Sequence, residues 1–164
     1  MTIEFSGKSM VGSELLAWWH KLEDDRGARA ELRRCKNVDE VVMTAAFQRL
    51  CSRLRPAFAN QLNWEERLAA IAGLLSHVKT TEPGLCLARQ MSEGSPPVVS
   101  ELRFRRLLQR DRAEFYPAMI RILHMLKGKA DVHDLARAIF YWGDSVKKAW
   151  AYAYFPNVPE KKSA

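Results

Sequence analysis

The sequence has few of the features that mark secreted or membrane proteins. Its cysteines number three, and none lies in a Cys-x-x-Cys pair (Cys35, Cys51 and Cys86). We therefore expect no disulfide framework, and we expect the protein to occupy a reducing, cytoplasmic environment. No apolar run is long enough for a signal peptide or approaches the ~20 residues of a membrane helix. We expect a soluble, cytoplasmic protein with no membrane partner.

Catalytic and metal-binding motifs are also missing. The histidines form no HxxxH or HExxH pair, and no GxxxxGKS phosphate loop or GxSxG motif occurs. The stretch DVHD (131–134) contains two carboxylates and an imidazole, but Asp131 is better placed as a helix N-cap than as a metal ligand. We therefore expect a binding protein with no enzymatic activity, no metal and no cofactor.

Strand patterns are absent as well, because no segment sustains the period-2 alternation of a Val-, Ile- and Thr-rich strand. Apolar residues instead recur every three or four positions, as in amphipathic helices. This spacing predicts helices near residues 11–24, 26–36, 43–55, 64–78, 85–91, 101–126, 132–142 and 145–155. The predicted fold class is all-α.

Local signals refine these boundaries. Asn63, with Glu66 three residues later, resembles a helix N-cap, and Pro56 is expected to end the preceding helix. Pro117 must lie in the first turn of its helix or bend it. Gly143 is a natural C-terminal stop.

The stretch EGSPPVV (93–99) divides the chain, because two consecutive prolines cannot lie inside a helix. We predict an N-terminal helical lobe (1–92), a linker (93–100), a C-terminal basic helical lobe (101–155) and a flexible tail (156–164). Together the two lobes would form an elongated helical bundle protein.

Positive charge is concentrated in the second part. The formal net charge is +7, of which residues 93–164 contribute +5 and residues 1–92 only +2. This asymmetry indicates a patterned basic surface, which suits an anionic partner.

The densest basic stretch is ELRFRRLLQRDR (101–112), in which only Glu101 and Asp111 oppose five arginines. On a helical wheel the apolar residues form one stripe (Phe104, Leu107 and Leu108). Three arginines flank it on one side and two on the other (Arg103, Arg106 and Arg110, then Arg105 and Arg112). A solvated helix whose arginine stems cover the core edge fits equally well. Repulsion among the arginines favours a polyanion as the partner.

Several of these segments together resemble a known family. The C-terminal half reads RFRRLLQRDR, then MIRILHML, then DLARAIFYWG followed by Lys147 and Lys148, and the N-terminal half reads LLAWWHKLEDDRGARAELRRC followed by AAFQRL. This order, over about residues 13–155, resembles the CasB family, the small subunit of the type I-E CRISPR Cascade complex. Two departures are Tyr141, where the family often has Trp, and Asp144, where it often has a basic residue.

The resemblance implies an all-helical, non-catalytic subunit that binds guide crRNA and target DNA. It implies other Cascade subunits and a second copy of the chain as partners, and a sequence-independent basic path that stabilises guide–target pairing and the displaced strand. The candidate nucleic-acid-binding residues are Arg103, Arg106, Arg110, Arg33, Arg34, Arg112, Arg121, Arg137, Lys147, Lys148 and Lys79; Arg33 and Arg34 match a paired arginine of the family.

Two other classes of protein remain open at this point. In a helix-turn-helix regulator, DLARAIFYWG (134–143) would supply the recognition helix, although it has many apolar residues for a helix that faces a DNA groove. In a structural scaffold, the arginines would meet acidic protein partners rather than nucleic acid.

Overall fold

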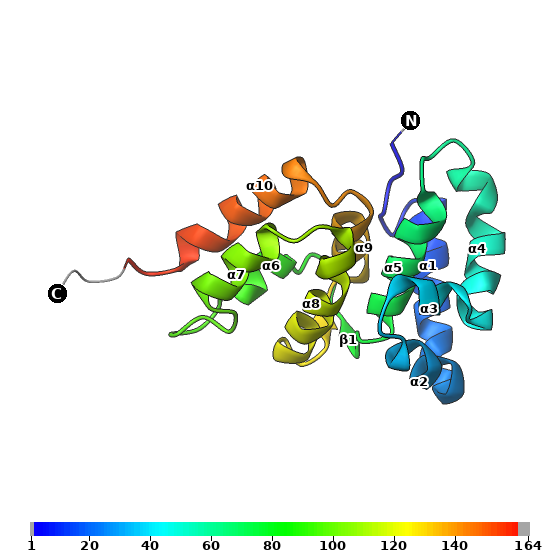
Figure 1. Cartoon of the computed structure of the whole chain (residues 1–164), viewed down its shortest axis with the longest axis horizontal. Coiled ribbons are helices and arrows are strands. Elements are labelled where there is room, and N and C mark those ends of the chain that lie inside the picture. Colours follow the sequence, from blue (N-terminus) through cyan, green and yellow to red (C-terminus); the bar gives the residue numbers. More distant parts are fainter. Residues whose placement is uncertain (1, 161–164) are drawn as a thin grey trace.

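Helices make up most of the computed structural model, which describes residues 2–160 (Figure 1). The helices of the N-terminal half are α1 (Met10–Asp24), α2 (Arg26–Arg34), α3 (Val38–Val42), α4 (Ala45–Phe58) and α5 (Trp64–Leu75). They are followed by α6 (Leu87–Met91), α7 (Glu101–Leu108), α8 (Arg112–Met125), α9 (Val132–Phe140), α10 (Asp144–Tyr154) and the 3-10 helix η1 (Phe155–Asn157). The predicted all-α class is confirmed.

The helices are arranged along the long axis of the molecule. Figure 1 shows α1 to α5 at one end, α6, α7 and α10 at the other, and α8 and α9 between them. One hydrophobic core runs through all of these parts, since α5 packs on α8 and α9. Helix α6, which the sequence assigns to the N-terminal lobe, packs against α10. The division at 93–100 into lobes stays a prediction, and residues 161–164 of the predicted tail lie outside the described residues.

One small parallel sheet was not predicted. Strand β1 (Thr80–Thr81) pairs with β2 (Lys129–Ala130), with Thr80 opposite Lys129 and Thr81 opposite Ala130. Two residues are too few for a detectable alternation, which is why the sequence gave no signal. The pairing brings the segment after α5 beside the segment after α8.

The start of several helices follows from their capping residues. Ser9 Oγ accepts a hydrogen bond from the Gly12 amide at 3.0 Å, and Thr44 caps α4 in the same way. Asn63 precedes α5 as predicted, but the prediction that its side chain caps the helix is wrong. The residue has φ 54°, and its side chain makes no capping hydrogen bond. Pro56 lies inside the last turn of α4 rather than ending it.

The basic stretch also departs from its prediction. The expected continuous helix divides, because α7 ends at Leu108 and Asp111 caps a new helix by accepting from the Glu114 amide at 2.9 Å. Pro117 lies beyond the first turn of α8. Arg110 is therefore in the connection between the two helices, and Arg112 is the first residue of α8.

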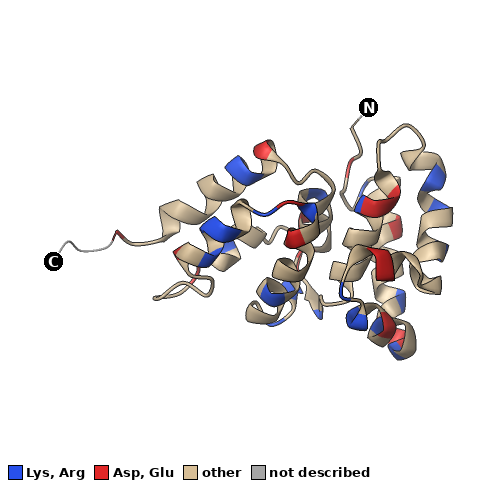
Figure 2. Ribbon diagram, viewed as in Figure 1, with Lys and Arg blue, Asp and Glu red and all other residues tan. Residues whose placement is uncertain are grey.

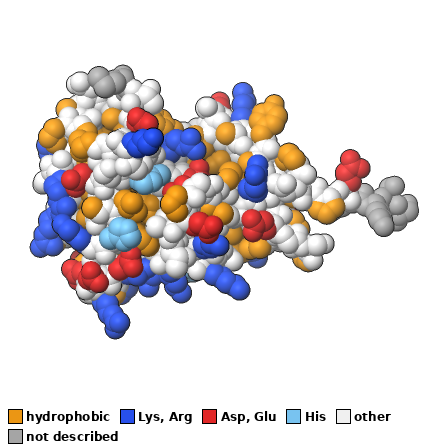
Figure 3. Space-filling model, turned by 180° about the vertical axis from the view of Figure 1, so that it is seen from behind, with side chains coloured by type: hydrophobic (Ala, Val, Ile, Leu, Met, Phe, Trp, Pro, Cys, Tyr) orange, Lys and Arg blue, Asp and Glu red, His pale blue; other side chains and the backbone are white. Residues whose placement is uncertain are grey.

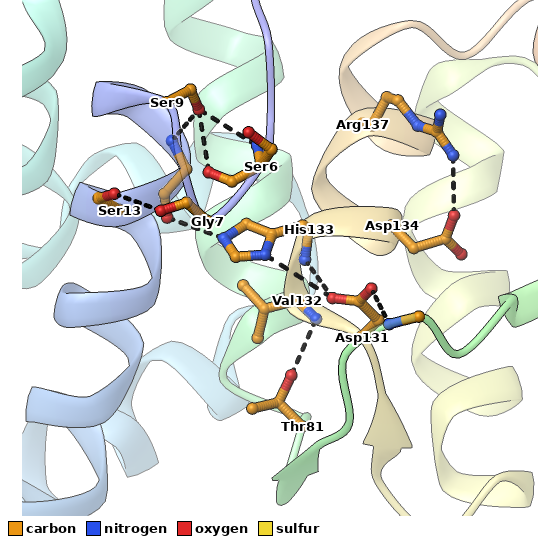
Figure 4. Close-up of polar contacts among 12 residues, drawn as sticks. Ser6, Gly7, Ser9, Ser13, Thr81, Asp131, Val132, His133, Asp134 and Arg137 are labelled. Carbon is orange, nitrogen blue, oxygen red and sulfur yellow. Dashed lines mark hydrogen bonds and ion pairs between the residues drawn. The ribbon is translucent and has the colours of Figure 1, made fainter.

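Polar contacts attach the start of α9 to α1, to β1 and to α6; Figure 4 shows the contact in which the Val132 amide donates to Thr81 Oγ1 of β1. Asp131 caps α9 by accepting from the His133 amide, and the His133 ring bonds the Gly12 carbonyl at the start of α1. Asp134 accepts from the Leu87 amide and so caps α6 from outside that helix. The DVHD stretch (131–134) therefore has a structural role, because its hydrogen bonds connect α9 to α1, β1 and α6.

Candidate nucleic-acid interface

A groove between α7 and α8 contains the strongest sequence candidates. Its volume is about 300 Å³, and it is lined by Arg103, Arg106, Leu107, Arg110, Ala118, Arg121, Ile122 and Met125. Four of the predicted arginines therefore meet in one place, although they come from two helices and the connection between them. No carboxylate is among the lining residues.

The core holds these arginines in position. Phe104 and Leu107 are buried on the inner side of α7, and the Phe104 ring stacks on Tyr154 with centroids 3.9 Å apart. Arg103 and Arg106, one helical turn apart, are consequently directed to the surface on the flank that faces α8. This confirms the apolar stripe, while the role of the arginines stays a prediction.

Little negative charge offsets the groove. Arg110 lies 4.0 Å from Glu114, at the limit of an ion pair, and both side chains are solvent-accessible. Within residues 2–160, no carboxylate forms an ion pair with Arg103, Arg106 or Arg121. Three of the four arginines of the groove therefore carry positive charge that no ion pair with a described residue offsets.

A second basic hollow, the His-Lys basin, lies farther along α8. Its lining residues are Arg33, His77, Lys79, His124, Lys127 and Gly128, and its volume is about 370 Å³. It adjoins the groove, because Arg121 of the groove and His124 of the basin are one turn apart on α8. Figure 2 shows basic residues on α2, α7 and α8, the helices that contribute to the two hollows. The face seen in Figure 3 mixes acidic, basic and apolar side chains.

Two predicted site residues, Arg33 and Lys79, lie in this basin. Arg33 Nε donates to the Ser76 carbonyl at 2.7 Å, and burial together with Arg29 lowers the pKa of Arg33. Arg34 is exposed on the last turn of α2 and lines neither hollow.

Arg112 has a different environment. Its guanidinium donates to the carbonyls of Ile139 and Phe140, each at 2.9 Å, and to that of Trp142 at 3.3 Å. These groups lie at the C-terminal end of α9, whose last carbonyls lack partners within the helix. Burial and Arg67 lower the pKa of Arg112. Its donors are already used to hold α9.

The remaining predicted residues lie outside both hollows. Arg137 forms an ion pair with Asp134 at 3.0 Å (Figure 4), so its charge is partly neutralised. The Lys147 ammonium lies 5.5 Å from the centre of the Trp142 ring, and Lys148 is exposed on α10.

Sequence reasoning missed His124 and Lys127 as members of a basic cluster. No local pattern marks them, because the β1–β2 pairing brings Lys79 beside them across the fold. Among the described residues, no group of His, Cys, Asp and Glu could hold a metal ion, and none of the helices is long and apolar enough to span a membrane.

Comparisons with known proteins identify the family. Residues 28–155 match the family model for CRISPR-associated protein Cse2. Similar folds occur in a chain of the crystal structure of E. coli Cascade bound to a PAM-containing dsDNA target (TM-score 0.72, 22% identity, 87% of this chain and 93% of that chain covered) and in the crystal structure of CasB from Thermus thermophilus (TM-score 0.65, 21% identity, 90% and 99% covered). No curated protein matches. The family match confirms the resemblance seen in the sequence: the chain belongs to the CRISPR-associated Cse2 family, which is the CasB family of type I-E systems.

Proposed function

We propose that this chain is the small subunit of a type I-E Cascade surveillance complex and binds the nucleic-acid backbone along the α7–α8 groove and the His-Lys basin. The observation that carries the proposal is the meeting of four arginines in a groove that no carboxylate lines. Family membership and the fold shared with a chain of E. coli Cascade support the assembly part of the proposal.

The chemistry of the groove suits phosphate rather than bases. Guanidinium groups bind phosphate oxygens through two parallel hydrogen bonds. Aromatic side chains, on which single-stranded bases stack, are missing from the groove lining within the described residues. Binding without sequence preference follows, since phosphate contacts carry no sequence information.

Such contacts are sufficient to favour target opening. Exchange of a DNA duplex for a guide–target heteroduplex is nearly balanced in free energy, so additional backbone contacts shift the equilibrium. In this proposal the subunit has no catalytic role. Its partners are crRNA, target DNA, other Cascade subunits and a second copy of the chain.

The structure weakens the helix-turn-helix alternative. Helix α9, the suggested recognition helix, buries Leu135, Ala136, Ala138, Ile139 and Phe140 in the core, whereas a recognition helix must present its side chains to the major groove. The scaffold alternative predicts salt-insensitive assembly and no nucleic-acid contact, which separates it from our proposal.

The test is reconstitution of the complex from this chain, its type I-E partner subunits and crRNA. The groove variant is Arg103→Gln, Arg106→Gln and Arg121→Gln, and the control variant removes equal charge outside the groove (Arg49→Gln, Arg53→Gln and Arg105→Gln). We expect all three proteins to assemble and target DNA to dissociate faster only from the groove variant. Failure of the wild-type chain to assemble would refute the subunit assignment, and equal dissociation rates would refute the groove.

A further inference from the structure

The His-Lys basin gathers cationic and imidazole groups from three parts of the chain. Arg33 comes from α2, His77 and Lys79 from the end of α5 and the segment after it, and His124 and Lys127 from α8 and the turn after it. No acidic side chain is among the residues that line it. An anion in the basin would therefore meet several positive groups and no negative one.

The backbone fixes the geometry of the basin. The amides of Lys79 and Thr80 both donate to the Gly128 carbonyl, at 2.7 and 3.2 Å. Gly128 has φ +74°, and a Cβ at this position would lie 2.8 Å from Lys79 Cγ. A glycine is therefore required both by the backbone conformation and by the close approach of the Lys79 stem.

Two imidazoles meet at the basin wall. His124 Nε2 lies 3.3 Å from His77 Nδ1, and this is the one hydrogen bond of the His77 ring among the described residues. Burial, His124, Arg33 and Arg29 lower the pKa of His77 to about 4, so its ring is neutral near pH 7. A neutral His77 can accept the Nε2–H of a protonated His124. Because His124 is exposed, its Nδ1 is accessible to a ligand in the basin.

The imidazole pair lies among cationic side chains. The charged groups around the imidazole pair are all cations: Arg29 and Arg33 on α2, Lys79 after α5, and Lys127 after α8. An anion bound among these cations would interact favourably with an imidazolium at His124. Anion binding and proton uptake are therefore linked thermodynamically.

We propose that the His-Lys basin binds one phosphodiester group of the nucleic-acid backbone, and that His124 takes up a proton as it binds. The identity of the ligand rests on the proposed function. The proton uptake makes backbone affinity rise as pH falls, through a group that has no role in the arginine groove.

The first test measures the affinity of the full chain for single-stranded oligothymidylate at pH 7.5 and 5.5, at constant ionic strength and with a dye insensitive to pH. Thymine and the phosphodiester do not titrate in this range, so a change in affinity reports the protein. We expect wild type to bind about three- to tenfold more tightly at pH 5.5, and His124→Gln to change less than about twofold. The control His20→Gln, at an exposed histidine of α1, should retain the wild-type change.

A second measurement separates this inference from the proposed function. Sulfate keeps its charge across the same pH range, so the His124 C2–H resonance can be titrated by NMR with sulfate or chloride at equal ionic strength. We expect the midpoint of the His124 titration to lie at a pH about 0.5 pH unit or more higher in sulfate than in chloride. The same midpoint in both salts, or an unchanged pH dependence in His124→Gln, would overturn the basin as an anion site. A sulfate-induced change without any oligothymidylate binding would support the anion site and refute the direct nucleic-acid contact.

Discussion

Arg112 and Arg106 provide a direct test of which arginines support the fold and which serve the surface. They are six residues apart in one basic stretch, yet Arg112 donates three hydrogen bonds to the end of α9, while Arg106 is exposed in the groove. We expect Arg112→Gln to destabilise the protein and Arg106→Gln to leave its stability unchanged.

The magnitude follows from the contacts that Arg112 makes. A hydrogen bond that involves a charged group contributes roughly 1.5–3 kcal/mol. Water can enter the cavity beside Arg112 and partly replace the guanidinium, because this cavity has a volume of about 390 Å³. We therefore expect a loss of about 2–4 kcal/mol in the free energy of unfolding from the three contacts together. For a chain of this length, that loss lowers Tm by roughly 5–15 °C.

The assay is urea or thermal unfolding followed by circular dichroism, with Arg106→Gln as the matched control. An exposed substitution such as Arg106→Gln should change the free energy of unfolding by less than about 0.5 kcal/mol. Equal stability of Arg112→Gln and wild type would show that its hydrogen bonds contribute nothing to the fold. Marked destabilisation of Arg106→Gln would contradict the assignment of that residue to a free surface.

Three further predictions concern the core. Phe104→Ala removes a fully buried ring stacked on Tyr154, and chemical unfolding should show a loss of about 3–5 kcal/mol. Gly73→Ala would place a Cβ 2.1 Å from the hydroxyl oxygen of the buried Tyr116, so unfolding should show a loss of about 1–3 kcal/mol from overpacking. Because the pKa of His77 is lowered to about 4 in the folded state and is near 6.5 in the unfolded state, the unfolded chain binds more protons between these values. The free energy of unfolding is therefore highest above about pH 6.5 and falls by roughly 2 kcal/mol by pH 5. His77→Gln should remove this pH dependence. An unfolding profile against pH identical to that of wild type would contradict the role assigned to His77.

The regular part of the fold was predictable because amphipathic spacing reports which face of a helix is buried. Leu15, Trp18 and Leu22 of α1, and Phe104 and Leu107 of α7, are buried as their spacing predicted. Met43, where the sequence predicted a helix to begin, is 84% exposed, because it is the C-cap of the unpredicted helix α3 and Thr44 after it caps α4.

Features that depend on contacts between distant segments were not predictable. Strands β1 and β2 are two residues each, and their pairing joins positions about fifty apart in sequence. The division of the basic stretch into α7 and α8 depends on Asp111, which reads equally well as a charged residue inside one helix.

The candidate site was predicted in part for the same reasons. Arg103, Arg106 and Arg110 share one flank of the wheel, and the structure brings Arg121 to the same groove from α8. Arg112 instead donates to carbonyls at the C-terminal end of α9, far along the chain. A helical wheel of the basic stretch gives no information on where those carbonyls lie. The place of His124 in the basin was not predictable for the same reason, because the other lining residues come from distant segments.

The most direct test of the central claim is the salt dependence of oligothymidylate binding by the full chain. Each phosphate contact contributes roughly −0.7 to the slope of log affinity against log salt on single strands. The groove variant (Arg103→Gln, Arg106→Gln and Arg121→Gln) should therefore show a slope about 2 less steep than wild type, whereas the control variant (Arg49→Gln, Arg53→Gln and Arg105→Gln) should retain the wild-type slope. Equal slopes for the groove variant and wild type would contradict a nucleic-acid interface in the α7–α8 groove.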